Sequence, residues 1–86
     1  MSLTTLNAVS RADIIRQAYR VLDHAAADAQ MFDPRKRDVV KALDELSKHG
    51  ATVGTLYYRR GLEQGSIGLL NEGLQFIQRE LSVFLV

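Results

Sequence analysis

Residues 66–85 read SIGLLNEGLQFIQRELSVFL, and their apolar side chains repeat with the period of an α-helix. Intervals of three and four residues separate a first column of apolar side chains: Ile67, Leu70, Leu74, Ile77, Leu81 and Phe84. A second column, at intervals of seven residues, falls roughly on the opposite side: Leu69, Phe76 and Val83. We therefore predict a helix over 66–85, with Ser66 as its N-cap.

The two apolar sides of this helix indicate contacts beyond a single chain. Such a helix lies at the centre of its domain or is partly buried against another chain, and an 86-residue protein has few other helices to cover it. We expect a homodimer or partner interface built from these side chains: Leu69, Leu70, Leu74, Phe76, Ile77, Leu81, Val83 and Phe84. For Leu70, Leu74 and Ile77, a place in the protein's own core is the favoured alternative.

Residues 50–61, GATVGTLYYRRG, precede this helix and predict a short helix over 52–60. In the simplest interpretation it is a packing helix. Gly50 then ends the preceding helix, Gly54 allows a neighbouring helix to approach closely, and Leu56 and Tyr57 face the core. The arginines at its end are solvated.

The same stretch resembles the turn and recognition helix of the tetracycline-repressor (TetR) family, in which a glycine turn precedes a [ST]-x-G-T-L-Y helix start. The matching residues are Gly50, Thr52, Gly54, Thr55, Leu56, Tyr57 and Tyr58. The resemblance implies a small helix-turn-helix DNA-binding regulator. It places four residues near the major groove and the phosphates: Thr52, Thr55, Tyr57 and Tyr58. Arg59, Arg60 and the basic cluster 35–37 would add contacts to the DNA backbone, which position a protein without specifying sequence.

Two further helices are expected nearer the N-terminus. Asp33-Pro34 predicts a helix over 34–49, because aspartate caps a helix start and proline suits the first helical position. Its apolar face is Val39, Val40, Leu43 and Leu46. Ser10 caps a helix over 11–30, whose apolar positions are Ile14, Ala18, Val21 and Ala25, flanked by Ile15, Leu22 and Ala29. Residues 1–9 lack a clear period and are expected to form a disordered or extended lead. The fold expected is an all-α, small four-helix bundle, with one helical domain over 10–86.

Composition limits the class of protein. The 86 residues are enough for one domain. Eleven basic and ten acidic residues give a net charge of +1, which favours the packing interpretation of 50–61, since phosphate affinity grows with the number of cations presented. There is no cysteine, no apolar run near the ~20 residues of a membrane span, and no secretory signal. We therefore expect a cytoplasmic protein.

No motif for catalysis stands out. His24 lies four residues before Asp28, which could orient its imidazole, but no third ligand or nucleophile is tied to either histidine. No glycine-rich phosphate loop is present. The sequence therefore predicts a protein that is not an enzyme and has no cofactor and no metal.

The function expected is that of a small helical binding or regulatory protein acting through protein–protein contacts, as an adaptor, an antagonist or a secretion chaperone. In size and pattern the chain is similar to small bacterial-type secretion chaperones and flagellar regulators of the flagellin-chaperone type. Those proteins are also short, cytoplasmic helical bundles. The expected partners are a second copy of the chain and another protein, with nucleic acid as the second choice and no membrane.

Overall fold

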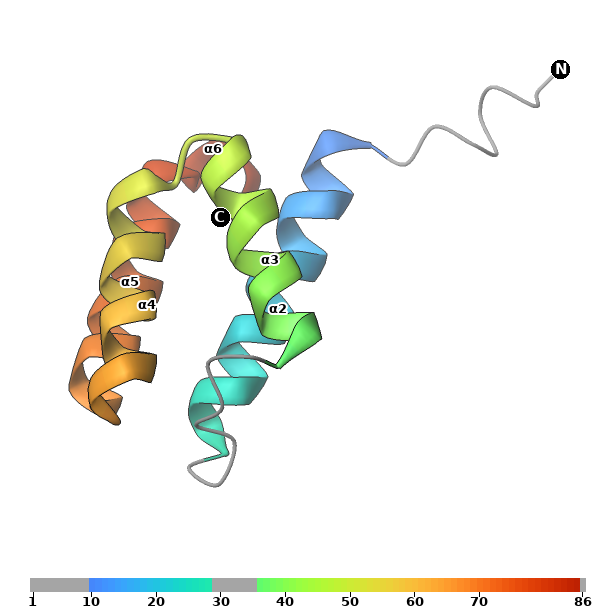
Figure 1. Ribbon diagram of the computed structural model, residues 1–86. Helices are drawn as coiled ribbons and strands as arrows, with labels where there is room; N and C mark the ends of the chain where they lie inside the picture. Colours follow the sequence, from blue (N-terminus) through green and yellow to red (C-terminus); the bar gives the residue numbers. More distant parts are fainter. Residues whose placement is uncertain (1–9, 29–35, 86) are drawn as a thin grey trace, which may run out of the picture.

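The computed structural model describes residues 10–28 and 36–85. These residues form helices joined by short turns, so the expected all-α class is confirmed for them (Figure 1). The helices are α2 (Arg11–Ala27), α3 (Arg37–Lys48), α4 (Thr52–Gln64), α5 (Ile67–Glu80) and α6 (Ser82–Leu85). The predicted lead over 1–9 and the predicted cap at Asp33-Pro34 fall outside the described residues. The predicted bounds of the first two helices are wrong: α2 ends at Ala27, because Asp28 is extended, and α3 spans only Arg37–Lys48, because Lys36 is still extended.

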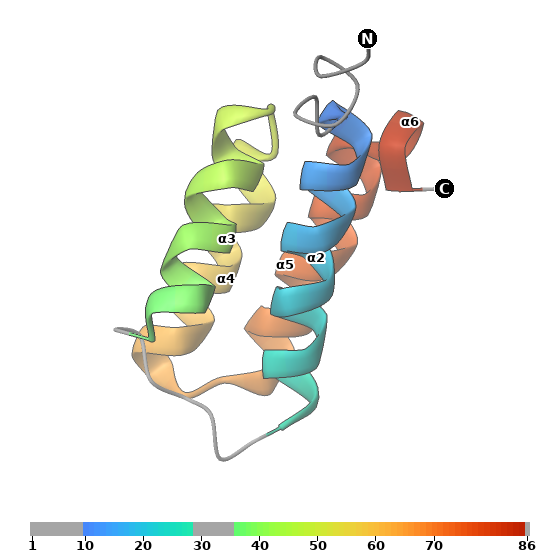
Figure 2. The ribbon, with the colours of Figure 1, turned by 90° about the vertical axis from the view of Figure 1, so that its right-hand side faces the viewer.

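The helices are arranged in two layers (Figure 1). One layer contains α2 and α3, which pack side by side, and the other is an antiparallel hairpin of α4 and α5, the most closely associated pair. Helix α2 also contacts α5 and α6, and α3 also contacts α4, so the two layers close around a common core. Figure 2 views the α2–α3 layer face on, with the α4–α5 hairpin behind it.

Two serines begin helices as the sequence predicts. The Ser10 side chain accepts a hydrogen bond from the backbone N–H of Asp13 at 3.1 Å. At the start of α5, the Ser66 side chain accepts one from the backbone N–H of Leu69 at 3.2 Å. Each bond satisfies an N–H that has no partner within its own helix, which is why serine is favoured at this position.

The predicted ends of the last two helices are wrong. The helix expected over 52–60 continues through Gly61 to Gln64 and ends at Gly65, whose left-handed φ of 65° suits glycine. The helix expected over 66–85 is interrupted: α5 ends at Glu80, and the chain turns at Leu81 before the short α6. Tertiary packing overrides local propensity at Gly61, because a helix interior tolerates glycine where another helix packs against it.

Three glycines allow α4 and α5 to approach until their backbones touch. A Cβ on Gly73 would lie 2.8 Å from the carbonyl oxygen of Gly54 and 2.8 Å from the backbone nitrogen of Tyr58. A Cβ on Gly61 would lie 2.9 Å from the backbone nitrogen of Leu70. Side chains larger than hydrogen do not fit at these distances, so Gly54, Gly61 and Gly73 form a glycine seam between the two helices. The expected close approach at Gly54 is confirmed.

The core uses the flanking apolar positions of α2 more than the main predicted ones. The buried residues of this helix are Ile15, Ala18, Leu22 and Ala26, whereas Ile14, Val21 and Ala25 are only half-buried. Helix α3 buries Val39, Ala42, Leu43 and Leu46, and leaves Val40 half-buried. Because adjacent positions on a helix point about 100° apart, α2 carries two neighbouring apolar stripes. The stripe with Ile15 and Leu22 is buried in the core, whereas Val21 and Ala25 of the other stripe are half-buried and pack against it.

Tyr58, rather than Tyr57, is the tyrosine of α4 that fills the core. Its side chain is fully buried and its hydroxyl donates a hydrogen bond to the carbonyl oxygen of Leu22 at 2.7 Å. Burial raises the pKa of this phenol, and the negative charge of Asp23 raises it further. The prediction that Leu56 and Tyr57 face the core is wrong, since Leu56 is 49% exposed and Tyr57 is half-buried.

The start of α4 is capped by a side chain from α5. Ala51 precedes the helix and has no side chain that could cap it. The Glu80 carboxylate instead accepts hydrogen bonds from the backbone N–H groups of Val53 at 3.0 Å and Gly54 at 2.7 Å. A carboxylate also interacts favourably with the positive end of the helix dipole. Glu80 therefore ties the end of α5 to the beginning of α4.

Replacing Glu80 by alanine is expected to lower the free energy of unfolding by about 1–2 kcal/mol, because two helix N–H groups lose their acceptor. The matched control is Glu72→Ala, which removes the same charge from an exposed position of the same helix. Urea unfolding followed by circular dichroism measures both variants. Equal effects of the two substitutions would contradict the capping role.

Candidate protein-interaction surfaces

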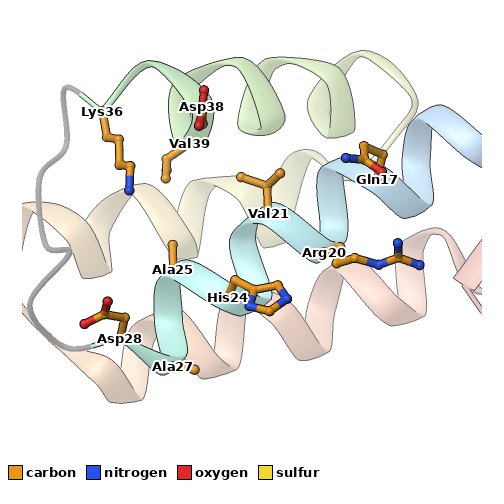
Figure 3. A pocket seen from close by; sticks show the side chains of 10 residues that line it. All are labelled: Gln17, Arg20, Val21, His24, Ala25, Ala27, Asp28, Lys36, Asp38 and Val39. Atoms are coloured by element: carbon orange, nitrogen blue, oxygen red, sulfur yellow. The ribbon is translucent and has the colours of Figure 1, made fainter.

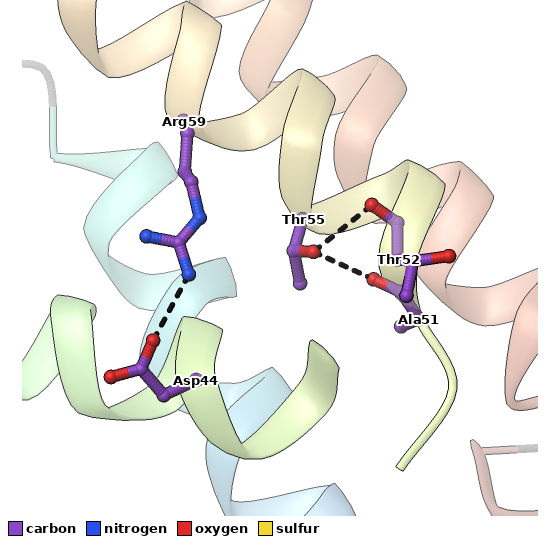
Figure 4. A network of polar contacts seen from close by, with 5 residues as sticks. All are labelled: Asp44, Ala51, Thr52, Thr55 and Arg59. Carbon is purple, nitrogen blue, oxygen red and sulfur yellow. Dashed lines mark hydrogen bonds and ion pairs between the residues drawn. The ribbon is translucent and has the colours of Figure 1, made fainter. Parts of the chain in front are cut away.

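The residues expected to contact DNA do not share one exposed face. Thr55 is buried, and its hydroxyl donates to the carbonyl oxygens of Ala51 at 2.8 Å and Thr52 at 3.2 Å (Figure 4). Tyr58 is buried against α2. The expected exposure of Thr55 and Tyr58 is therefore wrong, because the side of α4 that carries them faces the α2–α3 layer.

The arginines of this stretch are placed differently from one another. Arg59 donates from Nη2 to Oδ1 of Asp44 at 3.1 Å, an ion pair that joins α4 to α3 (Figure 4). Thr52 and Arg60 are exposed. Of the six side chains that the DNA interpretation places near DNA, Tyr57 and Arg59 are half-buried, and Arg59 lies beside an acidic partner.

Half of the predicted interface lies in the core. Four of its eight side chains are at most 5% exposed: Leu70, Leu74, Ile77 and Leu81. Their assignment to an interface is wrong, because they are buried in the protein's own core, and the alternative stated for Leu70, Leu74 and Ile77 is the correct one. The other four reach the surface. Val83 is 86% exposed, and Leu69, Phe76 and Phe84 are half-buried.

A half-exposed aromatic pair joins α4 to α5. The ring centroids of Tyr57 and Phe76 lie 4.8 Å apart, with the planes tilted by 43°. The Arg79 guanidinium lies over the Phe76 ring, 5.8 Å from its centroid. Val53, four residues before Tyr57 and thus on the same side of α4, is 44% exposed. We call the surface formed by Val53, Tyr57, Leu69 and Phe76 the aromatic face.

A second surface lies between α2 and α3, where two adjoining hollows of about 570 and 700 Å³ form one open groove. Figure 3 shows the side chains that line the first of these hollows. Both hollows are lined by Gln17, Val21 and Asp38. In Figure 3, Val21 and Val39 point into the space between the two helices. The remaining apolar lining of the groove comes from Ile14, Ala18, Ala25, Ala27 and Ala42. We call this surface the α2–α3 groove.

The two histidines belong to separate environments. His24 is exposed and lines the α2–α3 groove. His49 accepts a hydrogen bond at Nδ1 from Nε of Arg11 at 3.2 Å, and its Nε2 lies 3.8 Å from the Glu45 carboxylate. Within residues 10–28 and 36–85, no group of three or more His, Asp or Glu side chains is arranged to hold a metal ion. None of the described helices has the length and apolar character needed to cross a membrane.

Comparisons with protein families, with curated proteins and with solved structures find no match for this chain. The function of this protein is therefore inferred from the chemistry of its own surfaces. It offers two surfaces with apolar centres and polar margins, a composition typical of sites where proteins bind one another.

Proposed function

We propose that this protein is a non-enzymatic, cytoplasmic binding protein that acts through protein–protein contacts, and that its partner docks on the aromatic face. The observation that supports the proposal is the half-exposed Tyr57–Phe76 pair, which joins α4 to α5 at the surface. Aromatic and arginine side chains are the types most often found at the energetic centre of protein interfaces. Tyr57, Phe76 and Arg79 supply both types within one cluster.

The aromatic face has enough apolar surface to contribute to binding. An aromatic side chain offers about 150–250 Å² for burial. Covering roughly 200 Å² of apolar surface contributes about 5 kcal/mol before the cost of association is subtracted. A flat face over two antiparallel helices suits an apolar stripe on a partner helix, as in other helix-docking interfaces. Such a surface suits an adaptor, an antagonist or a secretion chaperone.

The margin of the aromatic face is polar and carries both signs of charge. Arg79 lies three residues after Phe76, and Glu72 four residues before it, so both flank the ring on the same side of α5. An apolar centre with a polar margin excludes water from the centre and adds selectivity at the edge. The partner is therefore expected to present apolar side chains flanked by charges.

Phe76→Asp is expected to abolish partner binding while leaving the helices intact, because it puts a charge at the centre of the aromatic face. The matched control is Gln75→Asp, which adds the same charge at an exposed neighbouring position. Tagged wild-type protein and both variants are expressed in the native cells, and captured proteins are quantified by mass spectrometry. We expect one or a few proteins to be retained by wild type and Gln75→Asp and reduced at least about tenfold by Phe76→Asp.

Circular dichroism of the three purified proteins provides the folding control. The same helix content in Phe76→Asp and wild type means that a loss of capture reports on the surface. Capture of identical proteins by all three, or of none above background by wild type, would contradict the proposal.

A further inference from the structure

We propose that the α2–α3 groove binds a second copy of this chain, in a two-fold symmetric dimer whose α2–α3 layers face each other with their helices antiparallel. The inference does not depend on the partner of the aromatic face. It rests on two features of the groove: the second apolar stripe of α2, and the order of the charges on α3.

The second apolar stripe of α2 is only partly covered by the protein's own core, against which Val21 and Ala25 pack. Ile14, Val21 and Ala25 recur at intervals of seven and four residues, which keeps them on one side of the helix. All three are half-buried and line the groove. A surface helix needs one apolar side to pack on its domain, and a second apolar side indicates a second packing partner.

The charges that α3 presents along the groove alternate in sign. From its N-terminal end they are Lys36, Asp38, Lys41 and Glu45, all of which line the groove. Read in reverse, the order of signs is inverted. A second α3 that runs antiparallel over the first therefore places Lys36 opposite Glu45 and Asp38 opposite Lys41, and each pair occurs twice.

Both pairings require nearly the same position of the two-fold axis. The midpoint in sequence between Lys36 and Glu45 is 40.5, and the midpoint between Asp38 and Lys41 is 39.5. The difference of one residue is about 1.5 Å along a helix, which long charged side chains absorb. A parallel arrangement in the same register places each charge against its own copy, so four like-charge contacts form. The charge pattern thus selects the antiparallel dimer.

The charges of α2 are compatible with this axis. Both hollows of the groove include Gln17, Val21 and Asp38, so Asp38, the second residue of α3, lies level with residues 17–21 of α2. The axis lies one to two residues further along α3, which runs antiparallel to α2 (Figure 2), and is therefore level with about residue 17 of α2. Reversal about residue 17 places Asp13 opposite Val21 of the second copy, and Arg20 opposite Ile14 of the second copy. Neither charge meets a like charge.

This dimer leaves the α4–α5 hairpin on the outer side of each copy, because the hairpin forms the other layer (Figure 1). If the proposed function holds, the dimer presents two aromatic faces pointing away from each other. It is then a bivalent binding protein, with the gain in avidity that two linked sites provide.

Two charge-swap variants test the dimer. Asp38→Lys with Glu45→Lys makes the α3 side of the groove entirely basic, and Lys36→Glu with Lys41→Glu makes it entirely acidic. Each variant alone is expected to be monomeric by sedimentation equilibrium at low salt, and an equimolar mixture is expected to restore the dimer mass. Arg37→Glu with Lys48→Glu is the control, since it makes the same change in net charge as the acidic variant at exposed positions of α3 outside the groove. It is expected to keep the wild-type mass.

The mass of the wild-type protein tests the dimer even if a variant misfolds. A monomeric wild type at about 100 µM and low salt overturns the proposal, as do charge-swap variants that remain dimeric on their own. A wild-type dimer whose mass is insensitive to the charge swaps overturns this interface. These measurements use purified protein alone, so their failure is distinct from a failure to find a partner for the aromatic face.

Discussion

Gly73→Ala is expected to lower the free energy of unfolding by about 2–3 kcal/mol, although alanine is the better helix former by about 1 kcal/mol. The added methyl group would lie 2.8 Å from the Gly54 oxygen and the Tyr58 nitrogen, and 3.1 Å from the Tyr58 Cα. These are backbone atoms, which cannot rotate away as the end of a side chain can. The α4–α5 hairpin must open by part of an ångström, and the contacts along the glycine seam weaken together.

The same substitution elsewhere in α5 provides the control. Gly68 is exposed, and a Cβ there would meet only the Ser66 Oγ, at 3.7 Å. Gly68→Ala is therefore expected to be neutral or to stabilise by up to about 1 kcal/mol. Urea unfolding of both variants, followed by circular dichroism, decides the matter. If Gly73→Ala is as harmless as Gly68→Ala, close packing between α4 and α5 does not hold the fold together.

Tyr58→Ala is expected to cost about 3–5 kcal/mol, as is typical of a large aromatic side chain removed from a core. The substitution leaves a cavity between α4 and α2 and removes the hydrogen bond to the Leu22 carbonyl. Since small domains have only about 5–15 kcal/mol of stability, a large part of the protein is expected to be unfolded at 37 °C.

Substitutions at Tyr57 and Tyr58 distinguish the loss of core packing from the loss of any aromatic ring. Tyr57→Ala is expected to cost only about 1 kcal/mol, mainly from the lost contact with Phe76. Tyr58→Phe, which keeps the ring and removes the hydroxyl, is expected to cost about 1 kcal/mol for the hydrogen bond. Thermal unfolding of the three variants measures this order. A larger loss at Tyr57 than at Tyr58 would reverse the assignment of inner and outer sides of α4.

The sequence was sufficient to predict that the chain is helical and to identify two helix starts. Ser10 and Ser66 cap their helices because the chemistry is local: a serine oxygen accepts an N–H three residues ahead. Local sequence also explains why the predicted helix over 52–60 is too short at Gly61. Local propensity counts glycine against a helix, and the compensating contact with Leu70 comes from another element.

The inner and outer sides of the helices could not be read from periodicity alone. On α2 the stripe with Ile14 and Val21 and the stripe with Ile15 and Leu22 are both apolar, so the pattern does not say which one packs inside. On α4 the glycine seam fixes the rotation of the helix, and this rotation turns Tyr58 inward. The groove and the aromatic face consist of side chains that the core leaves at the surface. They could not be predicted from the sequence, because the rotation of each helix about its own axis was not known.

Site-specific photo-cross-linking in the native cells is the most direct test of protein binding through the aromatic face. A benzophenone amino acid at position 57 would stand within the face, and one at position 75 would stand on an exposed neighbouring position of the hairpin. We predict one discrete cross-linked partner from position 57 and none of that mass from position 75. No adduct from position 57, or the same adducts from both positions, would contradict a binding function for this surface.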